Sequence, residues 1–184
     1  MTSPTVSRLR PDELGAAAPQ LAELLMDAVD GGASVGFPAS LDRTAAEAWW
    51  LSHATALADG SHVLVTARDG DRITGTAGVG FASYPNGRHR AEIFKLLVHR
   101  DARRRGLGRA LLAAAEHGAA SAGATLLILD TETGSPAETL YRSVGWTAAG
   151  VIPDYAADPA GELRPTTFFF KKLVSKCPTV DPAS

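Results

Sequence analysis

The 184-residue chain is poor in cysteine and has no long apolar run. Its single cysteine, Cys177, cannot form an internal disulfide, and we interpret it as a spare thiol because it lies in a polar, proline-containing stretch. No stretch approaches the roughly 20 apolar residues that a membrane-spanning helix needs. The first residues lack the basic and apolar regions of a signal peptide. These absences predict a cytoplasmic protein with no membrane partner and no metal.

The chain also lacks an excess of charge of either sign. Its net charge is −2, and a hydrophobic fraction of 45% with a charged fraction of 21% is ordinary for a globular protein. The arginines between Arg100 and Arg109 have no basic counterpart elsewhere in the sequence, which argues against a nucleic-acid partner. The length favours one domain with its own core. We assign residues 1–175 to this domain and expect residues 176–184 to be a disordered tail.

Hydrophobic periodicity and turn signals predict a mixed order of strands and helices. Pro19 should kink or divide the first helix, and Thr44 and Glu47 have the spacing of a capping box at the start of the second. The expected strands are 6–9, 62–68, 72–81, 89–98, 125–130, 146–152 and 166–173, and the expected helices are 12–29, 44–57, 107–121 and 136–143. This order predicts a single-domain α/β fold, with a mixed, mostly antiparallel central sheet flanked by helices on both faces.

The most distinctive stretch, residues 96–112, reads as an apolar strand, a basic turn and the start of a helix. A helix N-terminus leaves backbone N–H groups unpaired and carries partial positive charge. Gly106 and Gly108 let the backbone approach a ligand, and the neighbouring arginines suit phosphate. The stretch lacks both the Gly-Lys-Ser/Thr ending of a nucleotide P-loop and the third glycine of a dinucleotide fingerprint. It predicts a pyrophosphate-bearing ligand; the simpler alternative is an ordinary turn with solvated arginines.

The spacing Arg103-x-x-Gly106-x-Gly108 after a strand resembles the pyrophosphate loop of the GNAT family of N-acetyltransferases, which bind acyl-coenzyme A. The order of elements resembles the fold of that family along nearly the whole chain. Residues 135–146 resemble a later helix of the family, with Ser135 near its usual asparagine. Within the family, residues 89–173 more closely resemble the tabtoxin-resistance acetyltransferases, which acetylate the amino group of a small β-lactam amino acid.

This resemblance implies that acetyl-CoA is the cosubstrate and that no metal is needed. The strand end would pair with the pantetheine arm like an added strand, and a bulge there would aim the backbone N–H of Val98 at the thioester oxygen. The implied cofactor-binding residues are Leu96, Leu97, Val98, Arg103, Arg104, Arg105, Gly106, Leu107, Gly108, Arg109, Ala110, Thr131, Ser135, Ala137 and Tyr141.

Acetyl transfer to an amine needs a base, because an ammonium with a pKa near 10 is mostly protonated at neutral pH. Glu92 and Asp130 are the candidates, and the resemblance implies that one is the base and the other an acid. Glu92 lies six residues before Val98, which places both on one strand face unless a bulge intervenes. Asp130 is expected to end the neighbouring buried strand. Alternatively, Glu92 is a surface residue paired with Arg88 or Arg90, and Asp130 forms a turn.

Three further features bear on the acceptor side. Tyr141 is the candidate acid for the leaving thiolate, because a phenol has a pKa of about 10; the alternative is a core aromatic residue. Trp49 and Trp50 cannot both face the core, so one packs there while the other contacts the acceptor or a partner subunit. Segments 31–37 and 155–164 are expected, by analogy with the fold, to shape the acceptor pocket.

The sequence thus predicts an N-acetyltransferase that transfers the acetyl group of acetyl-CoA to a primary amine by direct attack. The acceptor would be a small molecule that resembles an amino acid, a toxin or an antibiotic, and the protein could form a homodimer. Two alternatives stay open. A protein or peptide N-acetyltransferase would need an open groove, and a non-catalytic acyl-CoA sensor would keep the fold without turnover.

Overall fold

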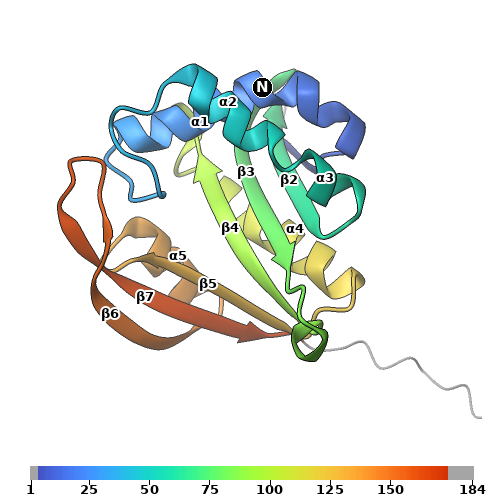
Figure 1. Cartoon of the computed structure of the whole chain (residues 1–184), viewed down its shortest axis with the longest axis vertical. Coiled ribbons are helices and arrows are strands. Elements are labelled where there is room, and N and C mark those ends of the chain that lie inside the picture. The colour runs from blue at the N-terminus through green and yellow to red at the C-terminus, as the bar shows by residue number, and fades with distance from the viewer. Residues whose placement is uncertain (1–3, 174–184) are drawn as a thin grey trace, which may run out of the picture.

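The computed structural model describes residues 4–173, which form one sheet with helices on both of its faces (Figure 1). The predicted tail at 176–184 and the thiol of Cys177 lie outside the described residues. In chain order the elements are β1 (Thr5–Arg8), the 3-10 helix η1 (Pro11–Glu13), α1 (Leu14–Asp30), α2 (Arg43–Leu51), α3 (Ala54–Ala58), β2 (His62–Asp69), β3 (Arg72–Phe81), η2 (Pro85–Gly87), β4 (Arg90–Val98), η3 (Arg100–Ala102), α4 (Leu107–Ser121), β5 (Leu126–Glu132), α5 (Pro136–Ser143), β6 (Thr147–Ala157) and β7 (Leu163–Lys172). The predicted α/β class and helices on both faces are confirmed.

The sheet runs in the order β1-β2-β3-β4-β5-β7-β6, and only its central β4–β5 pair is parallel. The ladder between these two strands covers only Arg90–Glu92 against Leu126–Ile128, although both strands continue beyond it. Figure 1 shows β4 and β5 diverging after this short ladder. The backbone edges that face each other across the opening are therefore available to an extended ligand.

Two apolar layers attach the helices to the sheet. On one face, Leu111 and Leu112 of α4 belong to the same buried cluster as Val79 of β3. On the other face, Leu25 of α1 and Trp50 of α2 belong to a second cluster. All five side chains are at most 1% exposed, as expected where an amphipathic helix turns its apolar stripe to a sheet. None of the helices within residues 4–173 combines the length and the apolar character needed to cross a bilayer.

The first two helices differ from the sequence prediction in their boundaries. Helix α1 is not divided at Pro19; it continues from Leu14 to Asp30. A proline removes one backbone donor from a helix, and the burial of the alanine- and leucine-rich face outweighs that cost. The predicted capping box of Thr44 and Glu47 is wrong. Asp42 is the N-cap of α2, because its extended backbone lets its carboxylate accept from the backbone N–H of Ala45 at 2.7 Å.

The predicted helix over 44–57 is also interrupted, and α2 and α3 are separate. At the break, two side chains lie within hydrogen-bond distance of the same backbone carbonyl, that of Trp49. Ser52 Oγ lies 2.6 Å and His53 Nδ1 2.9 Å from the carbonyl oxygen of Trp49. Such local side-chain bonds offer the backbone an alternative to a continuous helix.

The C-terminal strands are longer than predicted. Strand β5 continues to Glu132, so Asp130 lies within the strand instead of ending it. Strands β6 and β7 extend to a hairpin, and the β6 ladder shifts register twice, between Ala148 and Gly150 and between Ile152 and Ala156. The full length of β6 could not be predicted from an alternating pattern of apolar and polar residues. Each extra residue in the strand reverses the face that the following side chains occupy, so the alternation is interrupted.

Candidate active site

A bulge in β4 decides which side chains reach the candidate site. The β3–β4 register shifts so that Thr76 pairs with Leu97 but Gly78 pairs with Phe94, and Lys95 has a left-handed φ of 50°. The expected bulge near Val98 therefore lies about three residues earlier. The extra residue reverses the parity of the strand.

The bulge separates the residues that a regular strand would place together. Glu92, Phe94 and Lys95 all line one cavity on the α2 side of the sheet. Val98 instead packs against the cluster that includes α4. The bulge that the sequence left open therefore does intervene between Glu92 and Val98, and it places Lys95 among the residues that line the cavity.

The predicted pyrophosphate loop begins α4 as expected. Gly106 is the N-cap with φ of 79°, and no side chain caps the helix. A left-handed backbone favours glycine, and an uncapped helix start leaves N–H groups free for an anion. Gly108 has another reason to be small, because a Cβ there would lie 3.2 Å from Leu140 Cδ2 of α5. One glycine therefore shapes the loop and the other allows two helices to pack.

The arginines around this loop divide between structural contacts and solvent. Arg103 Nε donates to the carbonyl of Val98 at 3.1 Å, and Arg109 donates to Ser143 Oγ at 3.1 Å. Arg105 lies 3.7 Å from Asp69. Arg104 is exposed, with a left-handed φ of 59°. Arg104 and the free N–H groups of α4 are thus the best placed to meet an anion.

A buried carboxylate, which sequence reasoning missed, contacts the residues between β4 and α4 from the side of α1. Asp27 of α1 is 8% exposed, and it accepts from the backbone N–H of Arg100 at 3.0 Å and from the guanidinium of Arg100. Arg103 and His99 lie 3.8 Å and 3.7 Å from the same carboxylate. A signal existed, because Asp27 occupies the apolar face of α1 between buried neighbours, where an unpaired charge is rarely tolerated.

We expect Asp27→Asn to weaken acetyl-CoA binding by roughly tenfold or more, because a hydrogen bond to a charged group contributes about 1.5–3 kcal/mol and each 1.4 kcal/mol is about a factor of 10 in affinity. Titration calorimetry would measure the affinity. The matched control is Glu23→Gln on the same helix, whose carboxylate lies 3.8 Å from Arg72 in an exposed pair. Such surface pairs contribute little, and an equal effect of both variants would contradict a specific role for Asp27.

The start of α5 occupies the side chains of Thr131 and Ser135. Ser135 Oγ accepts from the backbone N–H of Glu138 at 3.2 Å and lies 3.2 Å from Thr131 Oγ1. Glu138 accepts from the backbone N–H of Gly134 at 2.5 Å. Ala137 packs against the cluster that includes α4. Cofactor binding by these residues stays a prediction.

Tyr141 has both of the characters that the sequence left open. Its ring is 5% exposed and packs near Trp146 and Phe169, with centroid separations of 6.0 and 5.9 Å. Burial, and then the nearby charge of Asp130, raise the pKa of the Tyr141 phenol well above its usual value. The phenol therefore stays protonated at neutral pH and can donate a hydrogen bond, but it is a weaker acid than a free tyrosine.

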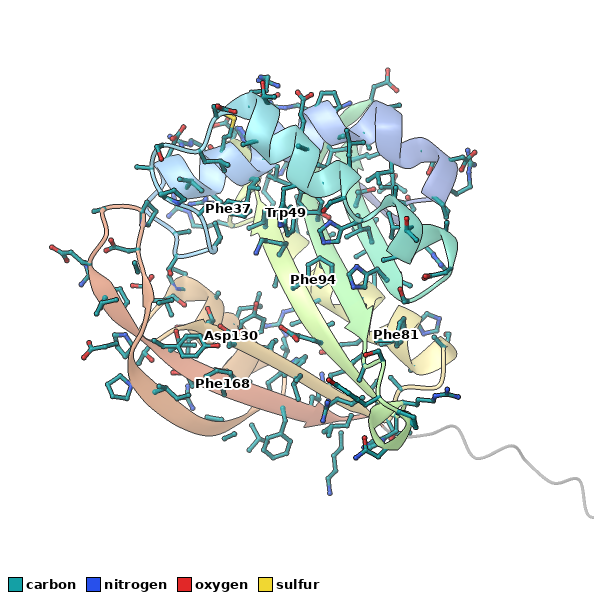
Figure 2. The ribbon with its side chains drawn as sticks, in the orientation of Figure 1. Phe37, Trp49, Phe81, Phe94, Asp130 and Phe168 are labelled. Carbon is teal, nitrogen blue, oxygen red and sulfur yellow. The ribbon has the colours of Figure 1, made fainter. Side chains whose placement is uncertain are left out.

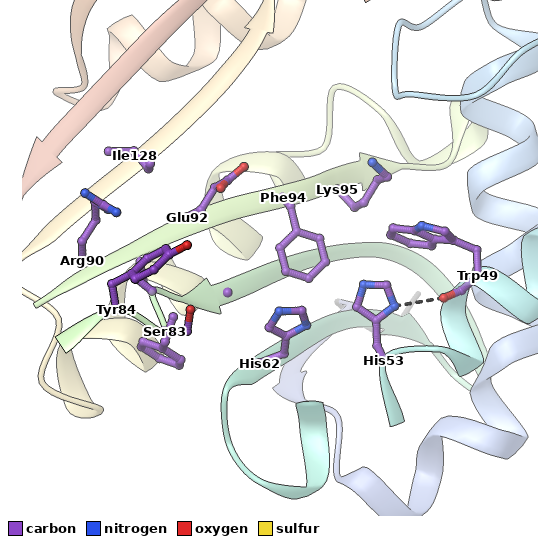
Figure 3. Close-up of a pocket in the computed structure, with 14 residues that line it drawn as sticks. Trp49, His53, His62, Ser83, Tyr84, Arg90, Glu92, Phe94, Lys95 and Ile128 are labelled. Carbon is purple, nitrogen blue, oxygen red and sulfur yellow. Dashed lines mark hydrogen bonds between the residues drawn. The ribbon is translucent and has the colours of Figure 1, made fainter. Parts of the chain in front are cut away.

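Glu92 occupies the last paired position of the β4–β5 ladder, and Asp130 lies two residues beyond that ladder on β5, where the strands diverge (Figures 2 and 3). Surrounding protein atoms raise the pKa of Glu92, and the charge of Asp130 raises it further. Loss of solvent around the carboxylate also raises the pKa of Asp130, while the positive charge of Lys95 acts to lower that pKa. Within residues 4–173, no ion pair joins Glu92 to Arg88 or Arg90. Coupled carboxylates with raised pKa values are typical of acid–base sites.

A cavity of about 470 Å³ opens beside Glu92. Figure 3 shows Glu92, Phe94 and Lys95 of β4 along one side of this pocket, with His53, His62 and Trp49 along another. The lining residues are Trp49, His53, His62, Gly80, Phe81, Ala82, Ser83, Tyr84, Arg90, Ala91, Glu92, Phe94, Lys95 and Ile128. Its volume is within the range of small-molecule sites.

One wall of this cavity is an aromatic cluster that sequence reasoning also missed. His53 stacks on Phe94 with a centroid separation of 5.6 Å and an angle of 26°, and His62 lies 5.3 Å from both rings. Burial, followed by the nearby His53, lowers the pKa of His62. The cluster therefore presents largely apolar ring surface to a ligand.

Trp49 and Trp50 divide as predicted between the pocket and the core. Trp50 is 0% exposed in the cluster with α1. Trp49 lines the cavity and meets the ring of Phe37, from the 31–37 loop, at 5.5 Å. Although the two tryptophans are adjacent in α2, one packs in the core and the other lines the cavity.

The segments 31–37 and 155–164 meet above the diverging strands. Ser34 Oγ donates to the carbonyl of Ala157 at 3.3 Å, and just beyond the loop the backbone N–H of Ala39 donates to the carbonyl of Pro159 at 3.1 Å. These segments do not line the main cavity; parts of them line a second hollow between Val29 and Ala160. They link the α1 side of the molecule to the β6–β7 hairpin across the opening.

Comparison with known proteins agrees with this geometry. The model of the acetyltransferase (GNAT) family matches residues 20–146. A ribosomal-protein-alanine N-acetyltransferase from Brucella melitensis is 24% identical with a TM-score of 0.76, covering 92% of this chain and 99% of its own. A phosphinothricin acetyltransferase from Sinorhizobium meliloti, solved in complex with acetyl-CoA, is 19% identical with a TM-score of 0.78, covering 94% and 89%.

A further similar structure is a GCN5-related N-acetyltransferase from Kribbella flavida, which is 21% identical with a TM-score of 0.75 and covers 93% of this chain and 98% of its own. At these identities the likeness shows a shared fold. The named acceptors of the first two proteins differ, one being a protein and the other a small molecule. These relatives therefore do not indicate which kind of acceptor this chain uses, and the relevant observations are those of its own pocket.

Proposed function

Because the chain belongs to the GNAT family, whose members are acetyl-CoA-dependent acyltransferases, we propose that it acetylates the primary amine of a small molecule. The single observation that carries this proposal is the pocket beside the diverging strands. Glu92, whose pKa is raised, lines this cavity of about 470 Å³, and Asp130, whose pKa is also raised, acts on Glu92 from the neighbouring strand β5. The tabtoxin-like subgroup stays a prediction, and the acceptor is derived from the pocket alone.

The bonds above the strands favour a small acceptor over a protein chain. A peptide acceptor needs an open groove in which an extended segment can lie. Here the loop after α1 bonds to the β6–β7 hairpin through Ala39 and Pro159, which restricts access along the opening. The cavity of about 470 Å³ matches a metabolite-sized molecule.

On the donor side, the unpaired N–H groups at the start of α4 would hold the pyrophosphate of acetyl-CoA. The β5-facing edge of β4, at Leu96–Val98, would pair with the pantetheine arm. The bound cosubstrate supplies an acetyl thioester, an acyl group with a thiolate leaving group. The side chains of Leu97 and Val98 pack in the two clusters, so only their backbone would contact the cosubstrate.

The site has a candidate base and a candidate hydrogen-bond donor for direct transfer of the acetyl group to an amine. Glu92 or Asp130 takes a proton from the acceptor ammonium and frees the nitrogen lone pair for attack on the carbonyl carbon. The new C–N bond replaces the C–S bond, the leaving sulfur carries the electron pair, and the second proton that the nitrogen loses as it becomes an amide neutralises the thiolate. Tyr141 donates a hydrogen bond to this thiolate, and the raised pKa of its phenol means that it keeps most of its proton.

The test is an acetylation assay with acetyl-CoA and a panel of small amines and unstructured peptides, following released thiol and acetylated product. Turnover of small amines but not of peptides is expected. Turnover of peptides alone would favour a protein acetyltransferase. Binding without any turnover would favour a sensor. Saturation at 100 times Kd should stabilise the protein by about 2.7 kcal/mol, and no thermal shift at high acetyl-CoA would remove the proposal.

We expect Tyr141→Phe to lower kcat about tenfold to a hundredfold, because one hydrogen bond to the leaving thiolate is lost, while the affinity for acetyl-CoA stays nearly the same. Steady-state kinetics and calorimetry separate the two effects. Phenylalanine conserves the ring contacts with Trp146 and Phe169, so folding should be preserved. Native kcat in this variant would remove Tyr141 from the reaction.

A further inference from the structure

Lys95 occupies a backbone conformation that lysine rarely adopts. Its φ of 50° is left-handed, and only glycine and, less often, asparagine or aspartate visit this region easily. The strain is retained at the bulge that turns its side chain into the cavity. Backbone strain that persists in a binding cleft indicates that the direction of the side chain matters.

The ammonium of Lys95 has no anionic partner within the described part of the chain. No carboxylate lies within 4.0 Å of Nζ among residues 4–173. The charge instead lies 5.0 Å from the ring centroid of Trp49 and 5.5 Å from that of Phe37. Two aromatic faces attract a cation only modestly, so the half-buried ammonium keeps an unmet preference for an anion.

The carboxylates of Glu92 and Asp130 favour the charged form of Lys95, and a charged Lys95 can bind an anionic group of a ligand. Burial lowers the pKa of Lys95, and the charges of Asp130 and Glu92 act against this and favour the ammonium. The two carboxylates and the one ammonium thus lie in one electrostatic neighbourhood without forming an ion pair. Figure 3 shows Glu92 and Lys95 along the same edge of the pocket, with Phe94 between them.

We propose that Lys95 binds the carboxylate of an amino-acid acceptor while Glu92 and Asp130 receive its amino group. This inference rests on the proposed function and names its substrate class. Residues 92 and 95 are three positions apart on β4, which corresponds to about 10 Å at most, and both side chains line the cavity. A zwitterion placed between them would bring each of its two charges to the opposite charge. The aromatic wall of His53, His62 and Phe94 then faces its side chain.

A purely structural lysine would behave differently. The ammonium of Lys95 lies over the rings of Phe37 and Trp49, and methionine is a flexible apolar side chain of similar length that lacks the charge. Lys95→Met therefore keeps the apolar contacts and removes only the ammonium. Arg90→Met is the matched comparison, because Arg90 is another cation that lines the same cavity, at the β4 end nearest Tyr84.

The experiment measures twenty L-amino acids and their carboxamides on the native protein, Lys95→Met and Arg90→Met. Two readouts are used: kcat/KM with acetyl-CoA, and the thermal shift that each compound causes in the presence of CoA. The amide keeps the amine and side chain but lacks the carboxylate. Comparing the proteins on one compound at a time cancels the different basicities of acids and amides.

For at least one acid, the native protein should prefer the acid to its amide. Lys95→Met should lower kcat/KM for that acid roughly tenfold to a hundredfold, through KM. The same variant should change the amide less than threefold, leave the acetyl-CoA Kd unaltered and abolish the thermal shift caused by the acid. An equal loss for acid and amide, or loss of the preference in Arg90→Met alone, would overturn the assignment. So would the absence of both turnover and thermal shift with every acid. Acid-specific binding without turnover would uphold the Lys95 site while the proposed function failed.

Discussion

Glu92→Gln and Asp130→Asn are each expected to lower kcat/KM, and the variant that removes the base should lose about 10²–10⁴-fold. The physical reason is that the acceptor ammonium must lose its proton before it can attack. Glu132→Gln is a matched control, because Glu132 lies two residues after Asp130 on the same strand. Steady-state kinetics with a turned-over amine would measure all three variants.

The pH dependence identifies which carboxylate acts. Because the pKa values of Glu92 and Asp130 are raised, the acid limb of the native kcat/KM profile should lie above the range of about 3.9–4.3 for free carboxylates. Without its base, the protein should depend on amine that is already deprotonated in solution, so its rate should rise steadily with pH toward the pKa of the amine. Native activity in both variants would show that neither carboxylate is the base.

The stability of Glu92→Gln should change in the opposite sense to its activity. A carboxylate whose pKa is raised on folding contributes stability below its unfolded pKa, and that contribution is lost as the pH rises through its folded pKa. Ionised Glu92 therefore destabilises the native protein at neutral pH, and glutamine cannot ionise. Urea unfolding at pH 4 and pH 7 should show the variant gaining stability relative to the native protein at the higher pH. A loss at both values would contradict the raised pKa of this carboxylate.

Trp50→Ala is expected to reduce the free energy of unfolding by about 3–5 kcal/mol, because truncating a fully buried tryptophan loses its transfer free energy and leaves a cavity. Trp50 of α2 is 0% exposed, in the buried cluster that α2 shares with α1. For a domain of this size the melting temperature should fall by roughly 10 °C. Thermal and urea unfolding would measure the change.

The adjacent Trp49→Ala is the informative control. Trp49 is partly exposed and contacts Phe37 and the ammonium of Lys95 in the pocket. Its loss should cost about 1 kcal/mol of stability but raise the acceptor KM. Equal destabilisation by the two variants would show that the division between core and pocket is wrong.

The sequence by itself determined most of the order of elements and the position of the loop before α4. These features depend on local rules. Periodicity distinguishes strands from helices, and the left-handed Gly106 starts α4 where the motif predicted. The roles of Glu92 and Asp130 were implied by the family resemblance, and the structure places the two residues on the neighbouring strands β4 and β5.

Only the tertiary structure decided how the pocket is lined and supported. The bulge at Lys95 depends on pairing with β3, so no period along β4 alone reveals it. Asp27 reaches Arg100 across 73 positions of the chain, and Ala39 meets Pro159 across the opening of the sheet. The free energy of such contacts arises from burial and pairing between distant segments, and local sequence carries little record of which segments will meet.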